Sequence, residues 1–363
     1  MDYFDALMQQ SHKGICPHFG ICGGCTLQNL PYEEQLRKKE KVLADLFVPL
    51  GLSPMTLSSS PVVWEYRNRV DFNFGRRFYD TPPPRDFERE TVLGFRAKNR
   101  WFHHLDIQQC QIAPSEMSSL LEAVRRWARN ANLHGFDSRT HKGTLKLLLV
   151  REGKHTGERM VVLVTGEPIT QLDSFRDTVL DVFPATSIHH AVSISPANVA
   201  YAEQTTLLYG KDWIKEEFHI PLTFGTRRIA VQVTPFAFLQ SNTFAAEILY
   251  AIVRNWIESF AFTELYDLYA GNGALGLACS DVVERIVSVE SMPDNITRRK
   301  EIALENNATN IEFINDKVEN YLTAIVQSQM SITSDAVVVL DPPRAGLHPK
   351  ALQHLLTLEP PYL

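Results

Sequence analysis

The chain has 363 residues, a net charge of −6 and an ordinary globular composition, with 44% hydrophobic and 21% charged residues. This length allows two or three domains with a sizeable core, and the composition excludes a disordered or fibrous protein. The acidic balance argues mildly against the broad basic surface of a non-specific nucleic-acid binder. We find neither a signal peptide nor an apolar run long enough to span a membrane, so we expect a cytoplasmic protein.

The predicted elements change in kind along the chain. Residues 1–30 form an irregular Gly- and Cys-rich segment, and residues 31–59 contain a helix with apolar positions at helical spacing. Residues 60–237 alternate short β-branched or aromatic runs with turns, which predicts an antiparallel sheet with a few helices. In residues 238–363, helices alternate with the strands ELYDLYA, RIVSVE, IEFIND and AVVVLDPPR. We therefore predict a mixed α+β domain followed by an α/β, Rossmann-like domain with a doubly wound parallel sheet.

The cysteine pattern indicates a metal site near the start of the chain. Cys16, Cys22 and Cys25 are crowded together, whereas Cys110 and Cys279 stand apart. An odd number of cysteines without a secretion signal is poor support for disulfides, and crowded thiols in a reducing compartment more often hold a metal. Iron and zinc both remain open, because both accept cysteine ligands. We expect Cys279 to pack in a core.

Three strand ends of the α/β domain carry residues suited to a nucleotide-type cofactor. The first strand runs from Asp267 into the turn GNG, where the backbone can approach a ligand closely. Glu290 ends the second strand, where a carboxylate can bind two ribose hydroxyls, so the pair fits NAD and S-adenosylmethionine almost equally. Asp341 opens a stiff Asp-Pro-Pro-Arg loop, which favours a methyltransferase over a dehydrogenase. Taken singly, each feature is as well explained by an ordinary capped turn.

In combination, these motifs resemble those of the RNA uracil-C5 methyltransferases, and in particular the family's iron–sulfur members. The resemblance is carried, in the family's order, by CPHFGICGGC, IQQC, FLQSN, DLYAGNG, SVE and LDPPRAGLHP, and it covers most of the chain. It implies S-adenosylmethionine as methyl donor and a [4Fe–4S] cluster held by Cys16, Cys22, Cys25 and Cys110. It also implies a methyltransferase domain over 238–363, an RNA-binding domain over 60–237, and packing of residues 31–59 on the methyltransferase domain.

The resemblance also assigns roles to five residues of the cofactor site. Gln240 would contact the methionine end, Glu290 the ribose, and Asp341 the region where methyl donor and target base meet. Tyr269 would flank the cofactor from the glycine turn. Asp316 is the candidate for hydrogen-bonding the adenine amino group, with a helix N-cap as an equal alternative.

The sequence departs from the family at the catalytic nucleophile. Family members add a cysteine thiolate to C6 of uracil, so that C5 can attack the methyl group. The corresponding cysteine is expected just after Leu363, and no cysteine of the printed sequence replaces it. We therefore expect the printed chain to bind the cofactor without completing the reaction. A non-catalytic RNA-binding or cluster-carrying protein derived from this family is the alternative.

RNA is the expected partner of this chain, and a monomer is the expected state. The target base must leave its stack to reach a buried methyl donor. Candidates for phosphate contacts are the arginines around the strand VDFNFG, with a solvated strand face as the alternative: Arg67, Arg69, Arg76 and Arg77. The resemblance favours 23S ribosomal RNA over tRNA, because the family's tRNA enzymes usually lack the cluster. An amino-methylating enzyme is disfavoured, because Arg344 follows the prolines where such enzymes carry an aromatic residue.

Overall fold

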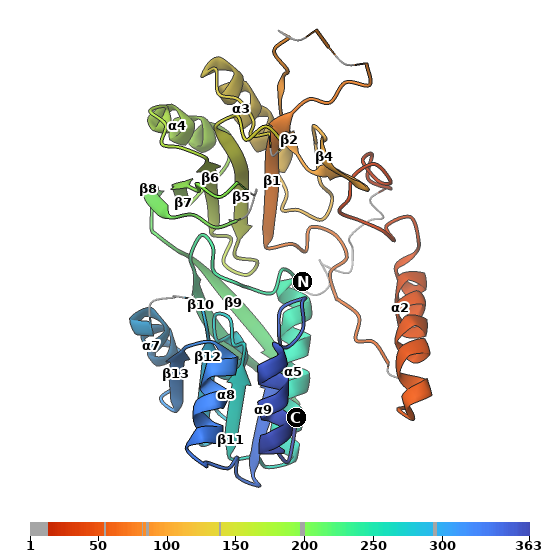
Figure 1. Cartoon of the computed structure of the whole chain (residues 1–363), viewed down its shortest axis with the longest axis vertical. Helices are drawn as coiled ribbons and strands as arrows, with labels where there is room; N and C mark the ends of the chain where they lie inside the picture. The colour runs from red at the N-terminus through yellow and green to blue at the C-terminus, as the bar shows by residue number, and fades with distance from the viewer. Residues whose placement is uncertain are drawn as a thin grey trace. The chain divides into compact units, whose positions relative to one another are not determined.

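The computed structural model describes residues 14–53, 56–81, 83–84, 87–137, 139–196, 200–292 and 296–363 (Figure 1). Contacts divide the chain into two units. The N-terminal unit runs to Ile214 and adds Thr234–Phe236 and Ser241–Ala245, and the C-terminal unit comprises Lys215–Val233, Ala237–Gln240 and Ala246–Leu363. Within the described ranges, no helix combines the length and the apolar character needed to cross a bilayer.

The front of the N-terminal unit is irregular, as its glycines and cysteines predict. Cys22 forms an isolated β-bridge with Ala97, and the Lys98 N–H donates to the Ile21 carbonyl at 2.8 Å. The predicted helix follows as α2 (Tyr32–Phe47), extended by the 3-10 turn η1 (Val48–Leu50). None of the residues of α2 is buried, so its packing on the methyltransferase domain stays a prediction.

A six-stranded sheet forms the centre of the N-terminal unit. Its strands in spatial order are β2 (Thr91–Gly94), β1 (Arg69–Arg76), β5 (Leu145–Glu152), β6 (Arg159–Thr165), β7 (Ser187–Val192) and β8 (Gln204–Gly210). Neighbouring strands pair antiparallel except β6 and β7, which are parallel. This pair corrects the prediction of an antiparallel sheet. Helix α4 (Leu172–Val182) connects β6 to β7, and such a crossover returns the chain in its original direction.

The core of the N-terminal unit joins this sheet to two helices. The remaining elements here are α3 (Met117–Asn130) and a small antiparallel ribbon of β3 (Arg96–Ala97) and β4 (Arg100–His104). Phe72 and Leu148 of the sheet are fully buried in one cluster with Trp127 of α3 and Phe175 of α4. The Trp127 Nε1–H donates to Ser174 Oγ at 3.0 Å, which satisfies the polar group of the indole.

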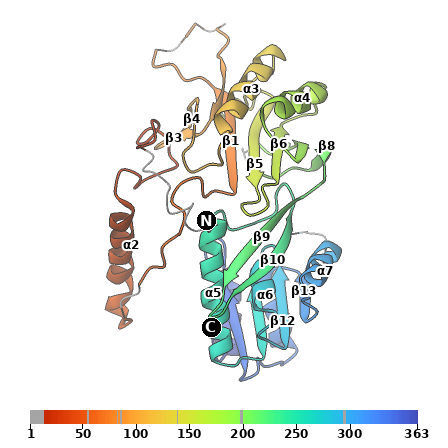
Figure 2. The same cartoon turned by 180° about the vertical axis from the view of Figure 1, so that it is seen from behind.

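The C-terminal unit contains the predicted doubly wound sheet, in which all strands are parallel. In spatial order the strands are β13 (Ile311–Asn315), β12 (Arg285–Glu290), β11 (Glu264–Leu268) and β14 (Ala336–Leu340). The helices are α5 (Thr243–Ser259), α6 (Ala274–Cys279), α7 (Ile296–Glu305), α8 (Val318–Gln327) and α9 (Pro349–Leu358). Leu268 and Val289 pack with α8 and α9 on one face (Figure 1), and Leu265 and Ile286 pack with α5 and α6 on the other (Figure 2).

The hairpin of β9 (Ile214–Pro221) and β10 (Thr226–Val233) also belongs almost entirely to the C-terminal unit. The predicted boundary at residue 237 therefore differs from the observed division. Asn306 explains part of the grouping, because its side chain bonds both the N–H of Ala230, at 2.8 Å, and its carbonyl, at 2.7 Å. Because Asn306 and Ala230 are far apart in sequence, the local strand pattern does not predict their contact.

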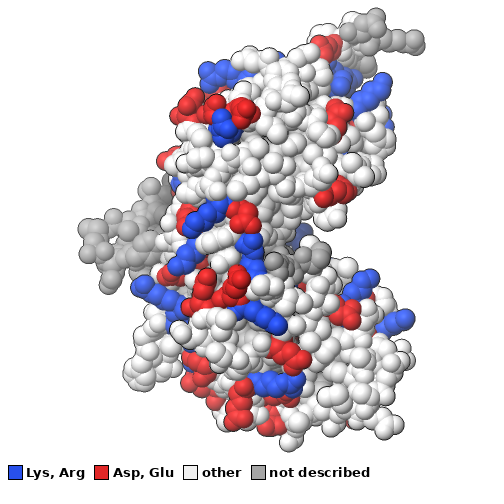
Figure 3. All heavy atoms as spheres, turned by 90° about the vertical axis from the view of Figure 1, so that its left-hand side faces the viewer, with Lys and Arg blue, Asp and Glu red and all other residues white. Residues whose placement is uncertain are grey.

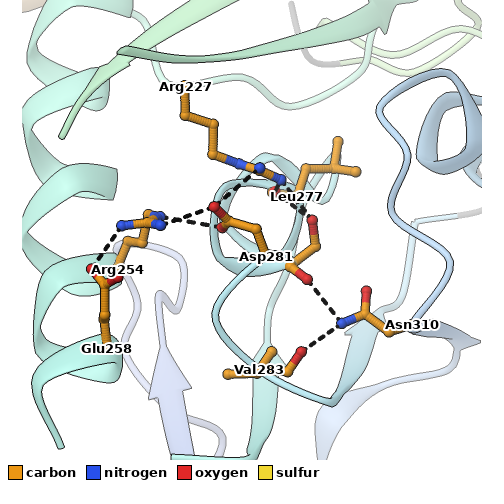
Figure 4. A network of polar contacts seen from close by, with 8 residues as sticks. Arg227, Arg254, Glu258, Leu277, Asp281, Val283 and Asn310 are labelled. Carbon is orange, nitrogen blue, oxygen red and sulfur yellow. Dashed lines mark hydrogen bonds and ion pairs between the residues drawn. The ribbon is translucent and has the colours of Figure 1, made fainter. Parts of the chain in front are cut away.

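A polar network joins this hairpin to two helices (Figure 4). At its centre Asp281 pairs with Arg254 Nη2 at 2.9 Å and with Arg227 Nη1 at 3.2 Å. Arg254 of α5 is almost wholly buried, so the Asp281 carboxylate compensates a charge held away from water. Asn310 extends the network by donating to the Ser280 carbonyl at 3.0 Å. The network thus connects β10, α5 and the end of α6.

Candidate cofactor site and cysteine cavity

The central strands of the C-terminal sheet end at a topological switch point. From β11 the chain continues to β12 on one side, whereas β14 lies on the other side of β11. In open α/β sheets, ligands bind outside the carboxyl ends of the strands at such a point. Leu268 is paired with Val289 and with Leu340 in the parallel register. The glycine turn, Glu290 and Asp341 therefore begin at the same edge of the sheet.

The turn after β11 requires its glycines. Tyr269, Gly271 and Gly273 all have positive φ, of 66°, 58° and 82°. A Cβ atom on Gly271 would lie 3.0 Å from the Phe238 ring, which leaves little room for a side chain. Asn272 accepts from the Ala274 N–H at 3.2 Å, while its Nδ2 is buried without a hydrogen-bond partner among the described residues. A buried amide without an acceptor, beside bare backbone, suits a polar ligand.

Glu290 is anchored to this turn through its carboxylate. Its Oε2 accepts from the Gly271 N–H at 3.0 Å, and its Oε1 accepts from the Met292 N–H at 2.7 Å. Oε1 also accepts from the exposed Ser291 hydroxyl at 3.2 Å. These bonds fix the carboxylate beside the turn, where Oε2 keeps a further acceptor position and a ligand hydroxyl can take the place of the Ser291 hydroxyl at Oε1. The geometry is therefore suited to receiving two hydroxyl groups.

Gln240 and Asp341 meet although they are 101 positions apart. The Gln240 Nε2 donates to Asp341 Oδ2 at 2.8 Å. This bond joins the FLQSN motif to the Asp-Pro-Pro-Arg loop after β14, two segments that the sequence predicted separately for the same site. Tyr269 lies at the start of the glycine turn, where burial raises the pKa of its phenol.

Asp316 makes local contacts just before α8. It is exposed after β13, and its Oδ1 accepts from the Lys317 N–H at 2.7 Å and from Asn320 Nδ2 at 2.9 Å. The N-cap position of α8 is Lys317, so Asp316 does not act as the N-cap residue. The adenine contact stays a prediction, which the second carboxylate oxygen could still make.

Two buried charged residues of this site were not predicted. Asp267 is buried, which raises the pKa of its carboxyl to about 7; the Gly276 N–H opposes this shift, and the charges of Asp341 and Glu290 add to it. Arg299 of α7 is also buried and donates from Nη2 to the Gly271 carbonyl at 2.9 Å. An acidic residue inside the apolar strand ELYDLYA was a usable signal for Asp267. Arg299 offered none, because charged residues are common on helices.

The four predicted cluster ligands line one cavity of the N-terminal unit. This cavity of about 280 Å³ has Cys16, Cys22, Cys25 and Cys110 in its wall. Burial, followed by the neighbouring Cys110, Cys22 and Cys16, raises the pKa of the Cys25 thiol to about 11. Segments separated by more than eighty residues therefore bring their thiols together.

The chemistry of this cavity fits a thiophilic group. Two polar atoms of its wall, His18 Nε2 and Gln111 Oε1, are buried without hydrogen-bond partners in the described part of the chain. Across the described ranges, however, no three histidine, cysteine or acidic side chains are spaced to hold a single metal ion. Cys279 is different, because it is fully buried in the core between α5, α6 and the sheet.

Two of the four arginines proposed around β1 form ion pairs within the N-terminal unit, and Arg76 Nε is buried without a hydrogen-bond partner among the described residues. Arg69 pairs with Asp71 at 2.8 Å, Arg77 pairs with Glu90 at 2.6 Å, and Arg67 lines the cysteine cavity. Their proposed contacts with phosphate stay a prediction. On the face drawn in Figure 3, basic and acidic side chains are interspersed, in keeping with the net charge of −6.

The doubly wound sheet, its switch point and the glycine turn define a Rossmann-like methyltransferase. A family model described as tRNA (uracil-5-)-methyltransferase matches residues 190–358. An RNA methyltransferase of Caldanaerobacter subterraneus subsp. tengcongensis is 30% identical over 95% of this chain and 73% of the relative. One from Protochlamydia amoebophila is 31% identical over 96% of this chain and 80% of its own length. The chain belongs to the RNA uracil-C5 methyltransferase family, and it is an RNA methyltransferase.

A solved structure agrees with this assignment. The Pyrococcus abyssi tRNA (uracil-54, C5)-methyltransferase in complex with S-adenosyl-L-homocysteine is similar with a TM-score of 0.68 and 25% identity. The similarity covers 94% of this chain and 76% of the other. The predicted fold class, family and enzyme class are therefore confirmed.

Proposed function

We propose that this protein methylates C5 of a uridine in 23S ribosomal RNA, with S-adenosylmethionine as the methyl donor. The observation that carries the proposal is the hydrogen bond between Gln240 and Asp341 at the switch point. It joins a glutamine and an aspartate to which the family resemblance assigns opposite parts of one reaction: the methionine end of the donor and the target base.

The proposed cofactor contacts follow the strand ends. Glu290, already fixed beside the glycine turn, accepts hydrogen bonds from the ribose hydroxyls. Gln240 contacts the methionine end, and Tyr269 flanks the cofactor. Asp316 accepts from the adenine amino group with Oδ2, since Oδ1 already accepts from the Lys317 N–H and from Asn320.

The proposed reaction proceeds through a covalent adduct. A cysteine thiolate adds to C6 of uracil, and the resulting enolate attacks the methyl carbon from C5, which breaks the S–CH3 bond and releases S-adenosylhomocysteine. A base then removes the C5 proton so that the thiolate leaves C6. Cys279 cannot serve, because it is fully buried and burial raises the pKa of its thiol. The nucleophile is proposed at a position just after Leu363.

The cysteine cavity is proposed to hold a [4Fe–4S] cluster as a structural clasp. The four cysteines that line the cavity would supply its thiolate ligands, which both iron and zinc accept. The resemblance to the iron–sulfur members of the family supports the cluster over zinc. Iron and sulfide analysis of anaerobically purified protein tests this, and stoichiometric zinc without iron would contradict it.

Transfer RNA is the second candidate substrate. The similar solved enzyme acts on tRNA, and the matching family model carries a tRNA name. Resemblance to iron–sulfur members of the family supports ribosomal RNA instead.

The decisive experiment supplies labelled S-adenosylmethionine to the full-length native protein with unmodified 23S rRNA or tRNA. We expect label at C5 of one uridine in 23S rRNA. Label only in tRNA would make tRNA the substrate. Cofactor binding without transfer to either RNA would support the non-catalytic alternative.

A further inference from the structure

The wall of the cysteine cavity carries one histidine that the proposed function leaves unused. His18 is the third residue of the segment CPHFGICGGC and lines the cavity together with Cys16, Cys22, Cys25 and Cys110. Its Nε2 is buried and has no hydrogen-bond partner among the described residues. A buried polar group without a partner is unfavourable, so a hydrogen-bond partner bound in the cavity would stabilise this nitrogen.

The backbone holds His18 between two of the proposed ligands. The His18 carbonyl accepts from the Cys22 N–H at 2.8 Å, and the Phe19 N–H donates to the Cys16 carbonyl at 2.8 Å. The Cys16 N–H in turn donates to Gln28 Oε1 at 3.0 Å. These bonds hold the backbone of His18 between Cys16 and Cys22.

A protein carboxylate does not explain this nitrogen. Asp106 is close enough to act on His18 electrostatically. Its carboxylate, however, pairs with Arg125 Nε at 2.7 Å and with Arg77 Nη2 at 3.2 Å. Asp106 is thus engaged by two arginines, and a group bound in the cavity that His18 lines is the candidate acceptor for Nε2.

We propose that His18 donates its Nε2–H to a sulfur of the group bound by the four cysteines. This inference rests on the cluster of the proposed function. Each N–H···S bond withdraws charge from the sulfur and stabilises the more negative, reduced cluster, so it raises the reduction potential. Such a partner also slows loss of the metal group, as is general for residues that orient metal ligands. His18 is thus a positioning residue and not a ligand.

The test compares three variants of the cluster-loaded protein, prepared without oxygen. His18→Leu removes the donor, His18→Gln keeps an N–H donor of similar reach, and Phe19→Leu changes the packing of the same wall without removing a donor. The measurements are the midpoint potential from a redox titration and the rate of cluster bleaching with a chelator. We expect His18→Leu to have a more negative potential and roughly 10-fold faster bleaching. We expect His18→Gln and Phe19→Leu to resemble the unaltered protein.

The results distinguish failure of the proposed cluster from failure of the proposed role of His18. An unaltered protein without iron would overturn both the proposed cluster and the role of His18. A loaded His18→Leu protein with unchanged potential would overturn the role of His18 alone. If His18→Leu folds but cannot load iron, loading of His18→Gln supports the donor role, and failure of both variants overturns it.

Discussion

Asp267 links the cofactor site to the pH dependence of stability. Its folded-state pKa of about 7 lies above the ordinary value of 3.8. The folded protein therefore binds more protons than the unfolded chain between these values, and the contribution of Asp267 to stability is lost as pH rises through this window. Burial makes the ionised form of this carboxyl unfavourable in the folded protein near neutral pH.

We predict that Asp267→Asn flattens this dependence. Compared with the unaltered protein, the variant should be relatively more stable at pH 8 than at pH 5, because asparagine has no charge to bury. The free energy of unfolding of the variant minus that of the unaltered protein should therefore be more positive at pH 8. Urea denaturation at both pH values measures it. Glu301→Gln, which removes one exposed carboxylate of α7, is the control. Equal pH slopes for Asp267→Asn and the unaltered protein would show that Asp267 does not titrate as described.

Glu290 carries the second prediction at the scale of single residues. Glu290→Ala removes the anchor of the Gly271 N–H and the proposed ribose acceptor together. Hydrogen bonds to a charged group contribute about 1.5–3 kcal/mol, so the Kd for S-adenosylmethionine should rise roughly 10- to 100-fold. Isothermal titration calorimetry measures this. Glu312→Ala, at the far end of β13 where Glu312 bonds Arg285 at 2.6 Å, should leave the Kd unchanged. Equal losses in both variants would point to general destabilisation.

At the scale of elements, the Asp281 carboxylate contributes to the attachment of the β9–β10 hairpin. Asp281 compensates both Arg254 and Arg227, and the Arg254 guanidinium has little access to water. Glu258 lies at the exposed end of the same network, where it pairs with Arg254 at 3.0 Å. Asp281 therefore compensates a buried charge, whereas Glu258 forms an ion pair at the exposed end of the network.

We predict that Asp281→Ala lowers the unfolding free energy by about 1–3 kcal/mol, since it leaves a buried guanidinium without its main acceptor. Glu258→Ala should cost at most about 1 kcal/mol, as for an exposed ion pair. Urea midpoints at constant slope measure both values. A larger loss for Glu258→Ala would contradict this ranking of the network.

At the scale of the whole molecule, the two ligands are proposed to act on different units. S-Adenosylmethionine at 100 times its Kd should stabilise the folded state that binds it by about 2.7 kcal/mol. Hydrogen exchange should then slow in β11 and β12 and stay unchanged in β5 and β6, since the switch point belongs to the C-terminal unit. Equal protection of β5 would indicate that the two units are coupled.

Removal of iron is expected to have the complementary effect. Residues 14–30 contain neither helices nor extended strands, and their cysteines are the proposed clasp between this segment and Cys110. Chelation should therefore increase exchange in residues 14–30 and leave β11 and β12 unchanged. The Cys279→Ser variant keeps all four proposed ligands and serves as the control. Unchanged exchange in residues 14–30 after iron removal would contradict the clasp.

Local patterns in the sequence determined much of the C-terminal unit. The strand RIVSVE has the predicted bounds, and the strand AVVVL lies within the predicted segment AVVVLDPPR. Both could be predicted because hydrophobic runs and turn residues act over a few neighbouring positions. The glycine turn and Glu290 were predictable for the same reason. Their place at a strand end already restricts which chemistry they can perform.

Tertiary structure decided the features that depend on partners distant in sequence. The parallel pairing of β6 with β7, the grouping of the hairpin and the position of Arg67 in the cysteine cavity all arise from such contacts. The burial of Arg299, which donates to the Gly271 carbonyl, was likewise not evident from the local sequence. The sequence by itself thus determined the order of elements and the kinds of reactive residue. Packing of the core decided which of those residues meet, because burial and hydrogen bonding are satisfied only in the assembled fold.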